Sequence, residues 1–137
     1  MFVEPYLNFN GRCEEAINFY KEALGATDVN IMRFSQSPEP CDPNMVLPGN
    51  ENKVMHSCFK IGTSTIMASD CSCTGQLKFE GISLTITAGS IEEADRLFAA
   101  ISASGQVQMP MTETFFSPRF GMAADKFGVS WMIIVQQ

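Results

Sequence analysis

The chain carries the same short pattern twice. A glycine, two glutamates, an alanine and apolar residues occur in 11–20 (GRCEEAINFY) and again in 89–98 (GSIEEADRLF), so the copies begin 78 positions apart. Each copy follows a short run that predicts a strand, and a glycine follows each expected helix, at Gly25 and Gly105. A unit present only twice cannot form a solenoid, which needs at least about three repeats. We therefore expect two half-modules that face each other across a cleft.

Size and charge exclude several classes of protein. A chain of 137 residues fits one domain and can bury a sizeable core without disulfides or metals. The net charge is −6 and no run of Lys or Arg occurs, so we expect no nucleic-acid partner. No apolar stretch approaches the roughly 18 residues of a membrane span, and no signal peptide is recognisable. We predict a soluble, cytoplasmic protein.

The cysteines predict reduced thiols. Five cysteines leave one unpaired in any complete disulfide scheme. A zinc site could combine Cys71 and Cys73 with Cys41 and His56, but paired zinc ligands are usually two to four residues apart. We expect neither a metal nor another cofactor.

Two amphipathic helices are predicted. The first should begin near Asn10 as its cap, and the second near Ser90, which with Glu93 forms a capping-box pattern. Each helix then shows an apolar stripe at helical spacing. We expect burial of Tyr20, Leu24, Phe98 and Ile101, with Trp131 beside them.

Strands fill much of the remaining sequence. In the first half they are expected at 29–34, 55–61 and 64–69, the last two forming a hairpin at Gly62. Segment 35–52 contains four prolines and predicts a long loop, which is a lid, a partner-binding segment or a simple surface insertion. In the second half strands are expected at 82–87, 106–111, 119–125 and 131–135. The prediction is an α+β chain with two βαβββ modules, about 1–75 and about 76–137.

Particular segments carry a family resemblance. They are 18–20 (NFY), 24–26 (LGA), 66–70 (IMASD), 113–116 (ETFF) and above all 125–133 (DKFGVSWMI). With the two modules, these segments resemble the PhnB-like branch of the glyoxalase, bleomycin-resistance and extradiol-dioxygenase superfamily, the vicinal oxygen chelate proteins. The resemblance implies a curved mixed sheet built from both modules, and a homodimer. Some members are labelled demethylubiquinone methyltransferases, but no strand here leads into a glycine-rich loop that could cradle a nucleotide-like cofactor.

The resemblance also implies where a metal would lie. Metal-dependent members place ligands on the first and last strand of each module, which here correspond to Pro5, Met67, Ser83 and Met132. These residues offer no anionic or imidazole donor for a divalent cation. Without that ion, the Lewis-acid chemistry of the superfamily is not expected.

The leading interpretation is therefore a metal-free protein that binds a small apolar or amphipathic molecule in its cleft. The expected contacts come from Met67, Ser83, Thr85, Phe116, Arg119 and Met132. Arg119 would supply a charge-assisted bond to an anionic group. A simpler reading is that Met67 and Met132 only fill the space of a lost metal.

Two other classes of function remain open. An enzyme of this fold could use His56 or Arg119, with Asp70 or Asp125 orienting His56, or a nucleophile at Cys58 or Cys71. An interaction module could instead grip a partner protein through the loop at 35–52.

Overall fold

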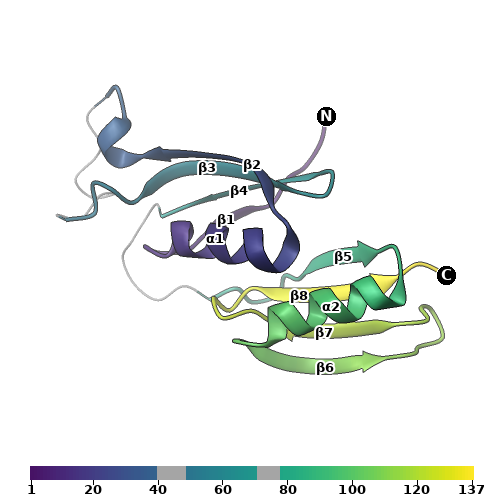
Figure 1. The fold of residues 1–137 in the computed structure, drawn as a ribbon. Coiled ribbons are helices and arrows are strands. Elements are labelled where there is room, and N and C mark those ends of the chain that lie inside the picture. The colour runs from purple at the N-terminus through teal and green to yellow at the C-terminus, as the bar shows by residue number, and fades with distance from the viewer. Residues whose placement is uncertain (40–48, 71–77) are drawn as a thin grey trace. The chain divides into compact units, whose positions relative to one another are not determined.

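The computed structural model describes residues 1–39, 49–70 and 78–137 (Figure 1). Its contacts divide the chain into two compact units, Met1–Leu77 and Lys78–Gln137, which are described separately below. The thiols of Cys41, Cys71 and Cys73 and half of the predicted loop at 35–52, residues 40–48, lie outside the described residues. No helix among the described residues is long and apolar enough to cross a membrane.

Unit one has the order βαβββ. Its elements are β1 (Tyr6–Asn8), α1 (Cys13–Leu24), β2 (Thr27–Arg33), a 3-10 turn (Phe34–Gln36), β3 (Val54–Ile61) and β4 (Ser64–Ser69). The sheet order is β1-β4-β3-β2, with β1 parallel to β4 and the other pairs antiparallel.

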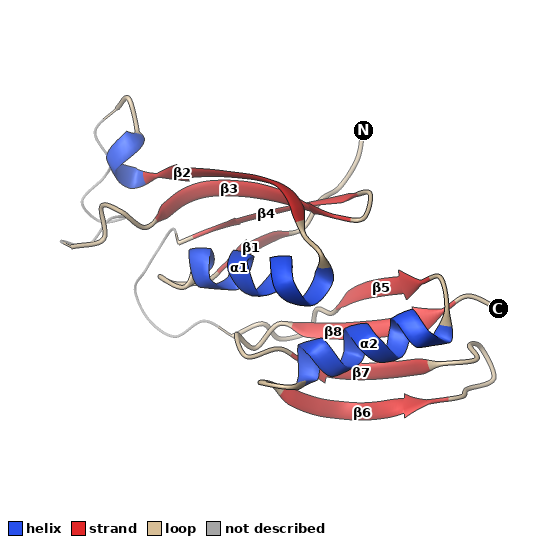
Figure 2. Ribbon diagram, viewed as in Figure 1, coloured by secondary structure: helices blue, strands red, loops and turns tan. Residues whose placement is uncertain are grey.

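Unit two repeats this topology. Its elements are β5 (Leu84–Ala88), α2 (Ile91–Ser102), β6 (Gln106–Thr112), β7 (Phe120–Ala124) and β8 (Ser130–Val135), in the sheet order β5-β8-β7-β6 (Figure 2). Both helices have 12 residues and begin 78 positions apart, the offset of the sequence repeat. The predicted α+β class and the two βαβββ modules are confirmed, as two four-stranded mixed sheets.

The two helices start in different ways. The hydroxyl of Ser90 accepts a hydrogen bond from the Glu93 amide at 3.1 Å, as the capping pattern predicts. The prediction that Asn10 caps α1 is wrong, because Arg12 occupies the cap position and makes no side-chain cap bond. Asp70, at the end of β4, accepts from the amides of Gly11 and Cys13 instead. A carboxylate 57 residues away from Cys13 therefore takes the place of the expected local cap.

The helix ends also differ. Gly25 has a φ of 69°, a left-handed conformation that glycine adopts without strain, and it caps α1 as predicted. The second helix ends at Ser102, before the predicted stop at Gly105.

The cores of both units lie between helix and sheet. Tyr20, Ile101 and Trp131 are buried as predicted, at 0%, 0% and 2% exposure. Leu24 and Phe98 were also expected to be buried, but both are only half-buried. They lie at the edges of the apolar stripes, whose centres are formed by Ala16, Ile17, Tyr20 and Ala23 in α1 and by Ala94, Leu97 and Ile101 in α2.

Candidate functional site

The sheet of unit one has a buried face and an outer face. The ring of Tyr20 in α1 stacks on Phe59, and the Sγ of Cys13 lies 3.7 Å from the Oγ of Ser57, so Ser57 and Phe59 face the helix. Strand alternation directs their neighbours His56, Cys58 and Lys60 away from it. We call this outer face, with Tyr6, Met32, His56, Cys58 and Met67, the α1-distal face.

Strand register arranges the residues of the α1-distal face. Met67 lies opposite Cys58 on one side and opposite Tyr6 on the other, while His56 lies opposite Met32. The rings of Tyr6 and His56 are 5.9 Å apart between centroids. The face therefore combines sulfur, imidazole and phenol groups.

Unit two has a corresponding face. Trp131 and Ile133 are buried, and the edge of Phe98 in α2 lies over Gly121, so these residues face the helix. Met132 is directed to the other side, where it lies opposite Thr85 in β5 and Met122 in β7. The Oγ1 of Thr85 is 3.8 Å from the Sδ of Met132. We call this surface, with Thr85, Thr87, Met122 and Met132, the α2-distal face.

The other expected contact and metal positions are divided between the two units. Phe116 packs edge-to-face on Phe120 at 5.1 Å, and Phe120 lies opposite Ile134 on the α2-distal face. Pro5 and Ser83 each lie one residue before a strand. Met67 belongs to unit one and Met132 to unit two.

Arg119 has a partner that the sequence did not reveal. Its Nε donates to Asp95 of α2 at 2.8 Å, and its Nη2 contacts the same carboxylate at 3.4 Å. The residue continues the pairing of β7 beside Val135, on the side of the sheet that carries α2. The guanidinium thus connects helix and sheet.

The two aspartates considered as partners of His56 are both engaged elsewhere. Asp70 binds the backbone amides of Gly11, Cys13 and Val54. Asp125 accepts from the amides of Phe127 and Val129 and from the indole of Trp131. Both carboxylates therefore have structural roles.

The residues present do not fit the divalent cation of the superfamily. The positions that the resemblance implies, Pro5, Met67, Ser83 and Met132, offer two thioethers and one hydroxyl as side-chain donors. The residues that register places beside the two methionines, Tyr6 and Thr85, add only a phenol and a second hydroxyl. Divalent cations of this kind prefer carboxylate or imidazole ligands. Within the described residues no group of three or more His, Cys, Asp or Glu side chains could hold an ion.

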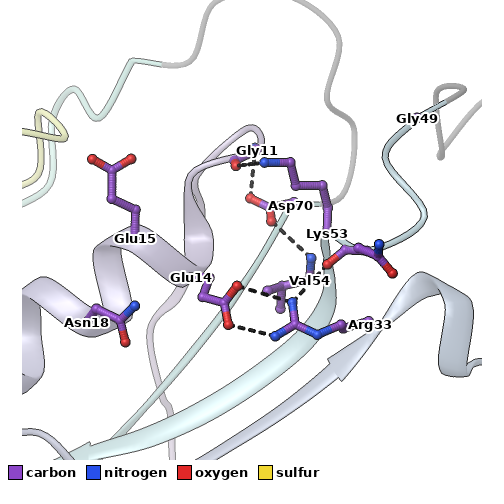
Figure 3. Close-up of a pocket in the computed structure, with 10 residues that line it drawn as sticks. Gly11, Glu14, Glu15, Asn18, Arg33, Gly49, Lys53, Val54 and Asp70 are labelled. Atoms are coloured by element: carbon purple, nitrogen blue, oxygen red, sulfur yellow. Dashed lines mark hydrogen bonds and ion pairs between the residues drawn. The ribbon is translucent and has the colours of Figure 1, made fainter.

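A polar pocket of about 490 Å³ lies at the start of α1 (Figure 3). The two cationic side chains that line it, Arg33 and Lys53, are already engaged in an ion pair or in hydrogen bonds to backbone carbonyls. Arg33 contacts both oxygens of Glu14, at 2.6 and 3.2 Å, and donates to the carbonyl of Asn52, while Lys53 donates to the carbonyl of Gly11. The lining residues are Gly11, Glu14, Glu15, Asn18, Arg33, Gly49, Asn52, Lys53, Val54 and Asp70.

The charged groups of the pocket hold unit one together. The hydrogen bond from Arg33 lowers the pKa of Glu14 below its ordinary value of 4.5. Asp70 is 1% exposed and its two oxygens accept from three amides, at 2.7, 2.9 and 3.0 Å. The pocket was missed from the sequence, because its residues come from separate segments. Only the position of Asp70 directly after a strand could have drawn attention to it.

Comparisons with known proteins identify the family. A family model described as 3-demethylubiquinone-9 3-methyltransferase matches residues 2–134. Protein YjdN of Escherichia coli (strain K12) is 35% identical over 142 residues, covering 98% of this chain and 95% of YjdN. A solved Bacillus cereus structure, described as a putative 3-demethylubiquinone-9 3-methyltransferase and PhnB protein, is 31% identical with a TM-score of 0.80, covering 98% of this chain and 99% of that one. The chain belongs to this PhnB-like family.

Further structures support the fold of this PhnB-like chain. The protein PA1353 from Pseudomonas aeruginosa is 37% identical with a TM-score of 0.84, and the match covers 100% of this chain and 98% of PA1353. A glyoxylase/bleomycin resistance protein/dioxygenase domain from Frankia sp. EAN1pec is 13% identical with a TM-score of 0.70, covering 100% of this chain and 92% of that domain. At that identity the likeness concerns the fold alone. The predicted glyoxalase/bleomycin-resistance fold is confirmed.

Proposed function

We propose that this PhnB-like chain binds a small apolar or amphipathic molecule against the α2-distal face of unit two. The observation that carries the proposal is the register of β8. It sets Met132, one of the positions at which the resemblance implies a metal ligand, between Thr85 and Met122. Thioethers adapt to irregular apolar surfaces, and a few hydroxyls suffice to orient a ligand.

The proposal gives separate roles to the residues of the α2-distal face. Met132 and Phe116 supply apolar surface, and Phe116 remains 41% exposed beyond its contact with Phe120. The hydroxyl of Thr85 supplies orientation, and Met67, which lies in unit one, is left out of this site. Arg119 is left out, because its ion pair with Asp95 would have to break before it could bind an anion.

A distant member of the fold illustrates the contrast. A mutant of the fosfomycin resistance protein FosX from Listeria monocytogenes was solved with Mn(II) and 1S,2S-dihydroxypropylphosphonic acid. It is 11% identical to this chain, with a TM-score of 0.61. Retaining a small-molecule site while losing the ion is the step we propose for the present chain. We do not propose methyl transfer, because each strand-to-helix connection carries a single glycine, Gly11 or Gly89.

The test uses the folded protein and the fluorescent probe 8-anilinonaphthalene-1-sulfonate, an amphipathic molecule with apolar aromatic rings and one anionic sulfonate. Met132→Glu should weaken probe binding about tenfold or more, because a buried contact would be replaced by a charge that repels the probe. Ile91→Glu, which adds the same charge at an exposed apolar residue of α2, is the matched control and should bind as wild type does. Equal probe affinity in Met132→Glu and wild type would contradict the proposal.

We also propose that the chain is a cytoplasmic homodimer. The edge strand β6 carries Val107 and Met109, at 52% and 40% exposure, and an apolar strand edge is usually paired or covered. Sedimentation at micromolar concentration should give twice the chain mass. A single species of 15.1 kDa would contradict this assembly.

A further inference from the structure

Four side chains with soft or borderline donor atoms form one block on the α1-distal face. Met32 in β2 lies opposite His56 in β3, and Cys58 in β3 lies opposite Met67 in β4. His56 and Cys58 are two residues apart on one strand, so their side chains project from the same face. Three neighbouring strands thus bring two thioethers, a thiol and an imidazole together.

The spacing of this block suits a single small ion. Directly opposed residues have Cβ atoms about 4.5–5.5 Å apart, and alternate residues on a strand are roughly 6.5–7 Å apart. The long, flexible side chain of methionine can span such a gap. The contact between His56 and Tyr6 directs the imidazole toward β4, because β4 lies between the strands of these two residues and carries Met67.

The block is accessible from solution. His56 is exposed, Met32 is 43% exposed, and Cys58 and Met67 are half-buried. The thiol of Cys58 is free, whereas that of Cys13 is fully buried beneath α1. An ion could therefore reach Cys58 without any opening of the fold.

We propose that His56, Cys58 and Met67 bind one monovalent copper ion. Thiolate and thioether ligands select Cu(I), whereas Mg²⁺ and Mn²⁺ prefer carboxylate, carbonyl and water oxygens. Binding would form a copper–sulfur bond at Cys58 and release the thiol proton to solvent, with no change in the oxidation state of the ion. Cu(I) is not the divalent ion that the resemblance implies, and of the proposed ligands only Met67 is among the positions implied for that ion; the proposal does not depend on small-molecule binding to the α2-distal face.

The test measures, by the loss of absorbance of the coloured Cu(I)–bicinchoninate complex, how much Cu(I) is transferred from that complex to the protein in the absence of oxygen. It uses a background in which Cys41, Cys71 and Cys73 are replaced by serine, so that only Cys13 and Cys58 remain as thiols. This background should take up one Cu(I) per chain and release one proton. Cys58→Ser and Met67→Leu should each lower the affinity by more than about tenfold, since even groups behind the metal ligands commonly contribute that much.

Matched controls separate the site from general effects. Met109→Leu changes an exposed methionine of β6 in unit two and should bind Cu(I) as the background does. His56→Gln is a second ligand variant if Cys58→Ser unfolds, and circular dichroism checks the fold of each. In the wild type, Cys58→Ser should reduce the copper bound by one equivalent, a readout that does not need the serine background.

Three results would overturn the proposal. One is no transfer of Cu(I) to the serine background in its folded state. Another is full Cu(I) affinity in both Cys58→Ser and Met67→Leu. The third is tighter binding of Zn²⁺ or Mn²⁺ than of Cu(I), which would assign the block to a different class of ion.

Discussion

Removal of the Asp70 carboxylate should destabilise unit one more than loss of an ordinary helix cap. Asp70 accepts three backbone hydrogen bonds, and those from Cys13 and Val54 are buried. A buried donor left without an acceptor costs about 1–3 kcal/mol, so two buried amides and one half-buried amide give about 3–6 kcal/mol for Asp70→Ala. Asp70→Asn keeps an acceptor for Gly11 and Cys13 but not for Val54, so its cost should be that of one buried amide, about 1–3 kcal/mol.

The assay is urea unfolding followed by far-UV circular dichroism, because the single tryptophan, Trp131, reports on unit two. Ser90→Ala is the matched control, since it removes one local cap bond of α2 and should cost about 1 kcal/mol. Amide hydrogen exchange at Gly11, Cys13 and Val54 should accelerate in Asp70→Ala. A loss no larger than that of Ser90→Ala would refute the reasoning.

Three further predictions concern stability. Glu14→Gln should lower the urea midpoint at neutral pH, and the difference from wild type should vanish in acid. The pKa of Glu14 in the folded protein is below 4.5, so the Glu14 carboxylate stabilises the fold at pH values above 4.5. This stabilisation is lost as the pH falls through the lower pKa of the folded state. Glu92→Gln in the first turn of α2 is the control, and a difference that persists in strong acid would contradict the argument. Gly105→Ala should lower the free energy of unfolding by about 1–3 kcal/mol, because the added Cβ would overlap the carbonyl oxygen of Ala124. Gly89→Ala, whose added Cβ would have its nearest atom 4.0 Å away, should leave the free energy of urea unfolding nearly unchanged. Phe98→Ala should lower the free energy of unfolding by about 1–3 kcal/mol, less than truncation of a fully buried ring would. A loss as small as that of Phe115→Ala, a truncation of an exposed ring, would show that the contact of Phe98 over Gly121 is unimportant.

Local patterns predicted the order of elements because their causes are local. The repeat at Gly11 and Gly89, the cap at Ser90 and the alternation of β5 depend on neighbours within one turn or one strand. The wrong prediction at Asn10 has the opposite cause, because the cap of α1 comes from β4 through a tertiary contact. Exposure of Phe98 likewise depends on how α2 lies across β7, which helical spacing alone does not specify.

The candidate site was predictable only in part. Strand alternation, which can be read from the sequence, separates buried Trp131 from Met132 on the other face and groups His56 with Cys58. The partners across the strands, such as Met67 opposite Cys58, required the register of β3 with β4. The pairing of Arg119 with Asp95 joins residues 24 positions apart, and nothing in either local sequence indicates it.

The long-range cap of α1 also bears on the order in which the chain can fold. The bonds that Asp70 accepts from Gly11 and Cys13 span 59 and 57 residues, whereas the cap of α2 spans three. Contacts between distant residues require closure of a long loop before they contribute, and they slow folding. Helix α2 can thus acquire its cap as soon as its first turn forms, but α1 must wait until β4 has been synthesised and has docked. During synthesis the N-terminal helix would complete its structure only when nearly all of unit one is present, although it is made first.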